Sequence, residues 1–282
     1  FFPQVAIAAV KVMEKNGISV FVPRQQCCGM PTLLEGDKET TLQRISYNLE
    51  MLLETTHSGY DLVCSCPTCG FLIKVLLKER ACYSDDYQRS VNAGADEIKI
   101  PDNKGGTEGF VSLNKSMYHK ILKDDGYFNA LGPLKRIALS GSMLDMGEYL
   151  NRLYLENRFN TRFGRLVSRM VYFAPCHQRE QGIGSPYEKL LALIPGLEIL
   201  RVGGALDCCG MGGSLGFKES FYEKSVELGR FLFRKIEAAV PDAIITDCMS
   251  CRLQFEHMLP YKVFHPLEVL SRAYESADLA QI

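Results

Sequence analysis

Eight cysteines of the chain form two groups of the same kind, a Cys-Cys-Gly run followed by a Cys-x-x-Cys pair. The first group consists of Cys27, Cys28, Cys66 and Cys69, and the second of Cys208, Cys209, Cys248 and Cys251. The two elements are separated by 37 residues in the first group and by 38 in the second. Thiolates at such spacings bind tetrahedral zinc or iron–sulfur clusters. The sequence therefore predicts two metal centres, one in each copy of an internal repeat.

A ninth cysteine, Cys176, follows the apolar segment at 171–175 and precedes the second group. It raises the number of sulfurs in that group to five. A tetrahedral zinc site binds four ligands, so five sulfurs in the second group favour an iron–sulfur cluster over zinc. The repeat predicts a counterpart of Cys176 a few residues before Phe1. We therefore expect the sequence to be a fragment whose first site lacks one ligand.

Three further residues beside these motifs could support the chemistry. Gly29 and Gly210 follow the paired cysteines, where a missing side chain gives the backbone room to approach a metal. His177 follows Cys176 and is expected to donate a hydrogen bond to a sulfur or to relay a proton, unless it only caps the next segment.

Two cysteines lie outside the repeated pattern. Cys64 is expected to pack on the side of the chain opposite the turn at Cys66. Cys82 matches no motif and is expected to have no role in metal binding.

Predicted strands lead into each cysteine motif, and predicted helices follow. The expected strands are 18–22, 60–63, the segment before Cys176, 197–202 and 243–246. The expected helices are 3–16, 37–54, 71–80, 186–193, 219–239 and 252–258. This alternation predicts an α/β fold of two pseudo-symmetric, Rossmann-like halves with open parallel sheets. The cysteines lie at the carboxyl ends of the strands, where such folds carry their chemistry.

The predicted halves are residues 1–168 and 169–282, with an insert at about 83–168 that matches neither repeat. Within the insert, the polar 92–109 segment is expected to be a loop, and 142–170 a basic helix. Its arginines are Arg152, Arg158, Arg162, Arg165 and Arg169. They form either a solvated helix face or a docking surface for a partner subunit or an anionic membrane.

Composition excludes several classes of function. The net charge of −1 offers no basic surface for nucleic acid. Eleven cysteines, an odd number, and the lack of an export signal favour reduced thiols in the cytoplasm over a disulfide framework. The glycines that begin at Gly210 fail the dinucleotide fingerprint because Leu215 occupies a required glycine position. No nucleotide-hydrolase, esterase or zinc-protease motif occurs, so we expect no independent catalytic residues.

The order of these motifs resembles the CCG-domain iron–sulfur oxidoreductases. That family includes the C subunit of anaerobic glycerol-3-phosphate dehydrogenase, the B subunit of heterodisulfide reductase and the iron–sulfur subunit of glycolate oxidase. The resemblance covers residues 1–80 and 170–282. It includes the segments Ala174–His177, Ile194–Leu197, Asp207–Gly210, Gly216–Lys218 and Thr246–Cys248.

The resemblance implies a subunit that carries electrons through cysteine-bound clusters from a partner flavoprotein dehydrogenase toward a quinone or another acceptor. The dehydrogenase would be of the glycerol-3-phosphate, lactate or glycolate type, in a complex with other iron–sulfur subunits. The resemblance also implies a [4Fe-4S] cluster in the second half, noncubane in the heterodisulfide reductase relatives, and either a [4Fe-4S] cluster or zinc in the first. Two alternatives stay open, a disulfide reductase that acts at its cluster and a zinc-stapled interaction module. The resemblance also implies a cytoplasmic protein, which lies at the inner face of the membrane where partners bring it there.

Overall fold

The computed structural model describes residues 2–102 and 109–279. The longer helices are α1 (Pro3–Lys15), α3 (Lys38–His57), α7 (Pro133–Ser142), α8 (Met146–Leu155), α11 (Tyr222–Ala238), α12 (Met249–Met258) and α13 (Pro266–Leu279). The short ones are α2 (Met30–Leu34), α4 (Pro67–Phe71), α5 (Asp85–Ser90), α6 (Lys115–Tyr118), α9 (Cys176–Arg179) and α10 (Pro186–Leu191). The strands are β1 (Leu62–Cys64), β2 (Glu97–Asp102), β3 (Gly109–Asn114), β4 (Met143–Asp145), β5 (Ser168–Tyr172), β6 (Leu197–Arg201), β7 (Ala243–Ile245) and β8 (Lys262–Phe264).

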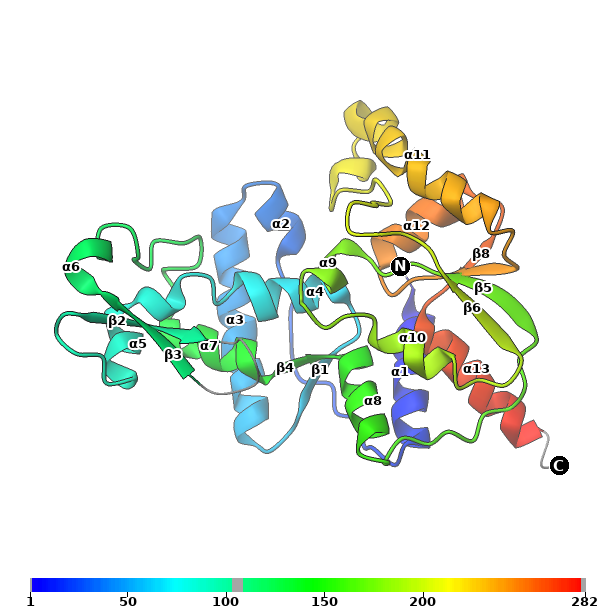
Figure 1. Ribbon diagram of the computed structural model, residues 1–282, viewed down its shortest axis with the longest axis horizontal. Helices are drawn as coiled ribbons and strands as arrows, with labels where there is room; N and C mark the ends of the chain where they lie inside the picture. The colour runs from blue at the N-terminus through cyan, green and yellow to red at the C-terminus, as the bar shows by residue number, and fades with distance from the viewer. Residues whose placement is uncertain (1, 103–108, 280–282) are drawn as a thin grey trace.

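The second half contains a four-stranded parallel sheet in the order β6-β5-β7-β8. In Figure 1, α11 and α12 lie on one side of this sheet, and α1, α10 and α13 lie on the other. Buried apolar strands with helices on both faces are typical of parallel sheets. The predicted α/β class is thereby confirmed, and the helices and strands of this half lie close to their predicted positions.

The first half has a smaller parallel sheet, in which β1 pairs with β4 alone. The strand predicted at 18–22 is wrong, because these residues have no ladder partner. Val20, Phe21 and Val22 are instead exposed. A strand needs a neighbour to satisfy its backbone groups, and apolar residues alone do not supply one.

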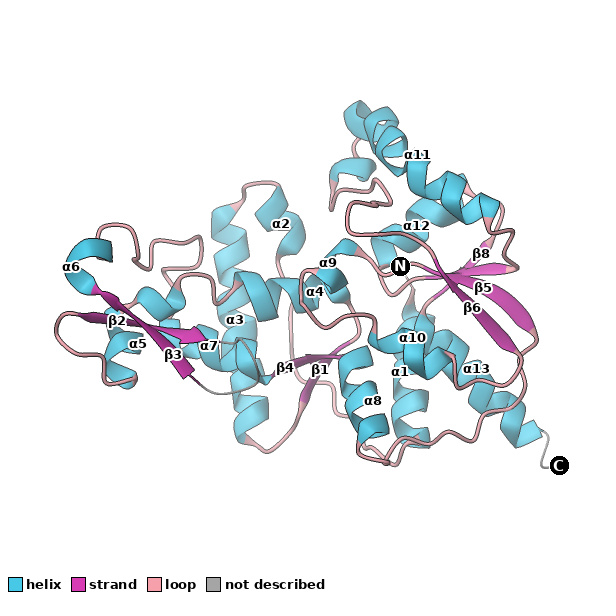
Figure 2. Ribbon diagram, in the orientation of Figure 1, coloured by secondary structure: helices cyan, strands magenta, loops and turns pink. Residues whose placement is uncertain are grey.

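The insert differs from its prediction in two places. β2 and β3 pair as an antiparallel hairpin within the segment expected to be a loop, whose residues 103–108 lie outside the described residues. The basic helix expected over 142–170 is shorter than predicted, because β4 precedes α8 and an irregular segment follows it. Of the five arginines, only Arg152 lies on α8. Figure 2 shows the hairpin and α5 at the end of the molecule distant from the four-stranded sheet.

One apolar core joins the two halves. It contains Val12 of α1 and Leu150 of α8 from the first half, with Leu190 of α10 and Leu270 of α13 from the second. Two smaller cores lie under the cysteine groups, around Cys28 and Ile45 in the first half and around Cys209 and Phe255 in the second. Because the halves share buried apolar surface, burial of that surface helps to fix the position of one half relative to the other.

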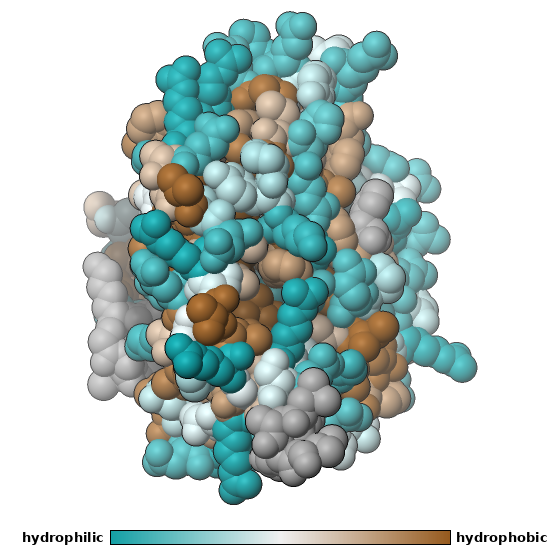
Figure 3. Space-filling view, turned by 90° about the vertical axis from the view of Figure 1, so that its right-hand side faces the viewer, coloured by the Kyte–Doolittle hydropathy of each residue, from teal (hydrophilic) through white to brown (hydrophobic). Residues whose placement is uncertain are grey.

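No helix among the described residues is long and apolar enough to span a bilayer. Figure 3 shows the face of the molecule next to the four-stranded sheet. Its apolar residues form separate patches among hydrophilic ones, with no broad apolar area on this face.

His265 links the halves at a buried position directly after β8. Its Nδ1 accepts a hydrogen bond from the Leu267 amide, 3.1 Å away, so the proton sits on Nε2 and is donated to the Ser65 carbonyl at 3.3 Å. Burial lowers the pKa of His265 to about 3. The neutral imidazole is therefore the form that the folded chain stabilises.

This burial predicts a loss of stability in mild acid. The ordinary pKa of histidine is about 6.5, so below that pH the unfolded chain binds a proton that the folded chain rejects, and stability falls as the pH falls toward 3. Between pH 7 and pH 5, wild-type protein should lose about 2 kcal/mol more than a His265→Gln variant in urea unfolding. A His57→Gln variant at an exposed position should behave as wild type. Equal pH dependence of wild type and His265→Gln would contradict the assignment.

Candidate metal centres

Folding brings the second group of cysteines together from separate segments. The Cys251 and Cys209 sulfurs lie 3.1 Å apart in a buried hydrogen bond. Cys208 also donates to Cys209, and Cys251 lies within hydrogen-bond reach of Cys248. Cys176 lies close enough for the charges of Cys248 and Cys209 to raise its pKa, although burial is the larger cause. The structure thus brings Cys208, Cys209, Cys248 and Cys251 within hydrogen-bond reach of one another and places Cys176 near them.

The first group shows the same arrangement. Cys28 accepts hydrogen bonds from Cys27 and Cys69, and these lower its pKa to about 3. The Cys69 thiol lies within reach of Cys28, Cys64 and Cys66, and these contacts raise its pKa well above the ordinary value. The pKa is thus lowered at Cys28, Cys66 and Cys209, which accept hydrogen bonds from other thiols, and raised at Cys69 and Cys251.

Cys64 is the residue of this site that sequence reasoning missed. The strand pattern predicts it on the opposite side of the chain from the turn at Cys66. Instead its sulfur lies beside Cys69 and donates to the Cys66 carbonyl at 3.3 Å. Cys64 is the last residue of β1, so the alternation of a strand no longer fixes the direction of the chain after it. With Cys64 included, the first group also contains five thiols, those of Cys27, Cys28, Cys64, Cys66 and Cys69.

Helix N-termini direct backbone amides at these sulfurs. Cys66 and Cys248 precede α4 and α12 as their N-caps, and Cys176 is the first residue of α9. The Gly210 amide donates to the Cys208 sulfur at 3.3 Å. Nearby backbone amides also lower the pKa of Cys66, Cys28 and Cys209. Amides at a helix N-terminus stabilise negative charge, so the fold prepares several of these sulfurs to act as thiolates.

Gly29 and Gly210 both adopt the left-handed backbone region, with φ of +89° and +90°. The second also lies where no side chain fits, since a Cβ there would stand 2.0 Å from the Ser225 carbonyl oxygen on α11. At Gly29 a Cβ would make only ordinary contacts, the nearest at 3.5 Å. The described structure thus assigns these glycines to the turn and, at Gly210, to the close approach of α11.

His177 connects the two cysteine groups. Its Nδ1 lies 2.9 Å from the Thr68 hydroxyl of α4, and its ring stacks on Phe71 with centroids 5.0 Å apart. Burial lowers its pKa, and the charges of Cys209 and Cys28, one from each group, act on it in the opposite direction. Figure 1 shows α4 and α9 side by side at the centre of the molecule. His177 therefore lies between the groups, and its described partners are Thr68 and Phe71.

A buried carboxyl precedes Cys248. Burial raises the pKa of Asp247 well above its ordinary value, and nearby Asp145 raises it further. The Gln178 amide donates to one Asp247 oxygen. Because a protonated Asp247 carries no charge, it adds nothing to the negative charge of the neighbouring sulfurs.

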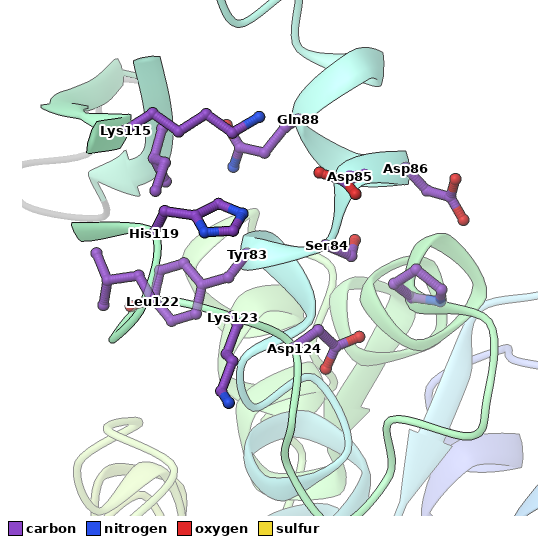
Figure 4. Close-up of a pocket in the computed structure, with 12 residues that line it drawn as sticks. Tyr83, Ser84, Asp85, Asp86, Gln88, Lys115, His119, Leu122, Lys123 and Asp124 are labelled. Atoms are coloured by element: carbon purple, nitrogen blue, oxygen red, sulfur yellow. The ribbon is translucent and has the colours of Figure 1, made fainter. Parts of the chain in front are cut away.

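A polar cavity lies away from both groups, in the insert. Its volume is about 350 Å³, and none of the site cysteines lines it. Figure 4 shows carboxylates of Asp85, Asp86 and Asp124 around it, with Lys115, Lys123 and His119. Asp124 is already paired with the buried Arg136. Charges of both signs line this cavity and match no single ligand class.

Comparison with known proteins decides the family. A family model described as CCG, Cysteine-rich domain, matches residues 1–74 and 170–256, which is more than half of the chain. The chain belongs to the CCG family. The matched segments contain both cysteine groups, and the insert falls outside them. The resemblance predicted from the sequence is confirmed.

Curated members of the CCG family align along nearly all of the chain. The C subunit of anaerobic glycerol-3-phosphate dehydrogenase from Escherichia coli (strain K12) is 26% identical over 273 residues, which cover 96% of this chain and 55% of that protein. The B subunit of fumarate reductase (CoM/CoB) from Methanothermobacter marburgensis is 26% identical over 281 residues, covering 96% and 44%. Lactate utilization protein A 2 from Bacillus cereus (strain 03BB102) is 24% identical over 279 residues, covering 96% and 93%. The chain thus spans about half the length of the first two relatives.

The donor set suits a sulfur-rich metal centre. Among the described residues, no three His, Cys, Asp or Glu side chains surround a point where a single metal ion would sit. The thiols are instead hydrogen bonded to one another, and these bonds lower the pKa of some sulfurs and raise that of others. Metal binding replaces such protons, because cysteine binds metals as the thiolate. Five sulfurs gathered in one site therefore fit an iron–sulfur cluster, whose charge would neutralise theirs.

The packing at Gly210 predicts a large effect of a single methyl group. Gly210→Ala should destabilise the chain by about 3 kcal/mol or more, since it combines a strained φ with overlap against α11. Gly182→Ala is the matched control, because Gly182 also has a positive φ, +69°, but open space around its Cβ position. It should cost only about 1 kcal/mol. Thermal and urea unfolding of both variants measure the difference, and equal losses would contradict the close approach of α11.

Proposed function

We propose that this chain is an iron–sulfur electron-transfer subunit of an oxidoreductase complex. The observation that carries the proposal is that two groups of cysteines lie near each other, since Cys69 of the first group and Cys176 of the second lie on the adjoining helices α4 and α9. The proposed ligands are the nine cysteines of the two repeated motifs, with Cys64 as a tenth. The bound clusters would supply one-electron redox chemistry at these positions.

The protein's part is to hold the sulfurs and set their surroundings. Amides at the helix N-termini donate to the thiolates, and such hydrogen bonds tune the reduction potential of a bound cluster. One thiol in each group, Cys27 in the first and Cys176 in the second, is exposed. These exposed edges are where a partner's redox group can approach. His177 and Phe71 stack on one another beside the helices α4 and α9.

The two halves, 1–168 and 169–282, are proposed to derive from an internal duplication. Three correspondences support this. The pair β1–β4 matches β7–β8 in direction and register, the glycine of each CCG run has nearly the same φ, and Cys28 and Cys209 are the hydrogen-bond acceptors of their groups.

The electron donor we propose is a flavoprotein dehydrogenase of the glycerol-3-phosphate, lactate or glycolate type, with further iron–sulfur subunits in the complex and a quinone as acceptor. The names of the relatives, which are a part of a dehydrogenase, a part of a fumarate reductase and a lactate utilization protein, support this choice. We also propose that the protein acts in the cytoplasm, where these partners hold it at the inner face of the membrane. The proposed cofactors are a [4Fe-4S] cluster in the second group and a [4Fe-4S] cluster or zinc in the first.

Anaerobic reconstitution tests the proposal. The protein should bind iron and acid-labile sulfide and absorb visible light that bleaches on reduction. Cys209→Ser should lose the iron and sulfide of the second group, which is at least about half of the total, because it removes a central sulfur of that group. Cys82→Ser is the matched control, since Cys82 lies in neither group, and it should retain wild-type content. Zinc alone in both groups would overturn the proposal in favour of a zinc-stapled module.

A disulfide substrate separates electron transfer from catalysis at the cluster. Given a reduced artificial donor, a pure electron carrier should transfer electrons to a quinone analogue and leave a disulfide substrate intact. Steady turnover of the disulfide would show that the chain is a disulfide reductase instead.

A further inference from the structure

The hairpin of the insert presents an exposed strand, β3, at its outer side. Among the described residues β3 pairs with β2 alone, and four of its six residues are exposed. Phe110 is 50% exposed and Val111 46% exposed. The insert lies outside the segments that match the CCG family model, so this hairpin is not part of the family repeat.

The outer edge of β2 is already occupied. The Gln88 side chain of α5 donates to the Lys99 carbonyl at 2.9 Å and accepts from the Lys99 amide at 2.7 Å. Pro101, two residues further along β2, has no amide hydrogen to donate. Proline and charged side chains are common protections of an edge strand. β2 is therefore closed to a further strand.

The same contacts show which backbone groups of β3 are open. Residue pairs in an antiparallel ladder alternate between those that exchange hydrogen bonds and those that do not. Because both backbone groups of Lys99 point to Gln88, those of its partner Ser112 point away from β2. Phe110, the partner of Pro101, has the same orientation. The amides and carbonyls of Phe110 and Ser112 thus face the open side of β3, where no described residue bonds to them.

β3 itself carries none of the protections seen on β2. Its sequence from Gly109 to Asn114 contains no charged residue and no proline. Like charges directly opposite each other destabilise a pair of strands, and two copies of β3 bring none together. An exposed edge of this composition is a template for another strand, and an identical strand is compatible with it.

One antiparallel register uses all of the open groups. With Ser112 at a two-fold axis, the backbone of Ser112 faces that of Ser112 in the second copy. Phe110 then faces Asn114 of the second copy, which is also an outward-facing position of β3. Each outward amide in this register meets an outward carbonyl, as a ladder requires.

The side chains support the same register. Val111 lies opposite Ile100, and Leu113 lies opposite the buried Ile98, so these four side chains share one face of the hairpin. In the register centred on Ser112, Val111 of each copy lies opposite Leu113 of the other. The apolar face of one hairpin therefore continues into that of the second, in the strand order β2-β3-β3-β2, and Val111 loses its exposure.

We propose that β3 pairs antiparallel with β3 of a second copy of this chain, with Ser112 at the two-fold axis. The contact is isologous, because the same strand serves both copies, so it closes at a dimer. No cysteine of either group lies on the hairpin, which Figure 2 shows at the end of the molecule distant from the four-stranded sheet. The dimer thus leaves both cysteine groups outside its interface.

Sedimentation equilibrium tests the proposal, with a reductant present so that no intermolecular disulfide contributes. The chain should show a monomer–dimer equilibrium, and Ser112→Pro should raise the dimer Kd at least about 10-fold, because it removes both hydrogen bonds at the axis. The Ser112 amide is not bonded to β2, so the hairpin keeps its own ladder in this variant. Ser112→Ala is the matched control, since it keeps the amide, and its Kd should stay within about 3-fold of wild type.

Hydrogen exchange locates the contact independently of any variant. Amides of Phe110 and Ser112 should exchange at least about 10-fold more slowly at protein concentrations where the dimer dominates. Amides of Val111 and Leu113, already bonded to β2, should change less. A chain that stays monomeric throughout the concentration series would overturn the proposal. So would a dimer that Ser112→Pro leaves intact, or protection of Phe110 and Ser112 that arises only when a different protein is added.

Discussion

Several buried thiols cannot all ionise side by side, and the rest of the structure depends on this constraint. Removing a charge from water is costly, and like charges at contact distance repel. Both cysteine groups meet this constraint by different pKa shifts of neighbouring thiols. The pKa is lowered at some sulfurs, Cys28 and Cys66 in the first group and Cys209 in the second, and raised at Cys69 and Cys251. A metal centre with positive charge is the partner that lets more of these sulfurs ionise together.

The fold is organised to sustain these groups. Short helices begin at the cysteines, so their amides face the sulfurs, and the glycine after each pair allows the turn. The shared core holds α1 against α13, and the contact of α4 with α9 brings the two groups to neighbouring positions. Electron transfer needs this proximity more than it needs a substrate pocket. The described structure accordingly places its sulfur chemistry on rigid element ends at the junction of the halves.

Much of this is predictable from sequence because cysteine spacing and apolar strands are local signals. They locate both groups, three of the four strands of the second sheet (β5, β6 and β7) and the family, but not β8. The predictions fail where contacts between residues distant in the sequence determine the local structure. The segment at 18–22 has the composition of a strand but no neighbour to pair with, and Cys64 turns toward the site only because β1 ends there. The polar composition of β2 predicts a loop, because its pairing with β3 is not visible locally. The tight fit of α11 over Gly210 is likewise a contact between distant residues.

The central claim is that the second thiol group holds an iron–sulfur cluster. Diffraction data collected on both sides of the iron absorption edge, from anaerobically reconstituted crystals, test it most directly. The account predicts an anomalous iron peak bonded to the sulfurs of Cys209 and Cys251, whether iron or zinc occupies the first group. Iron bound only elsewhere on the chain, or a peak at the second group that appears only at the zinc edge, would contradict it.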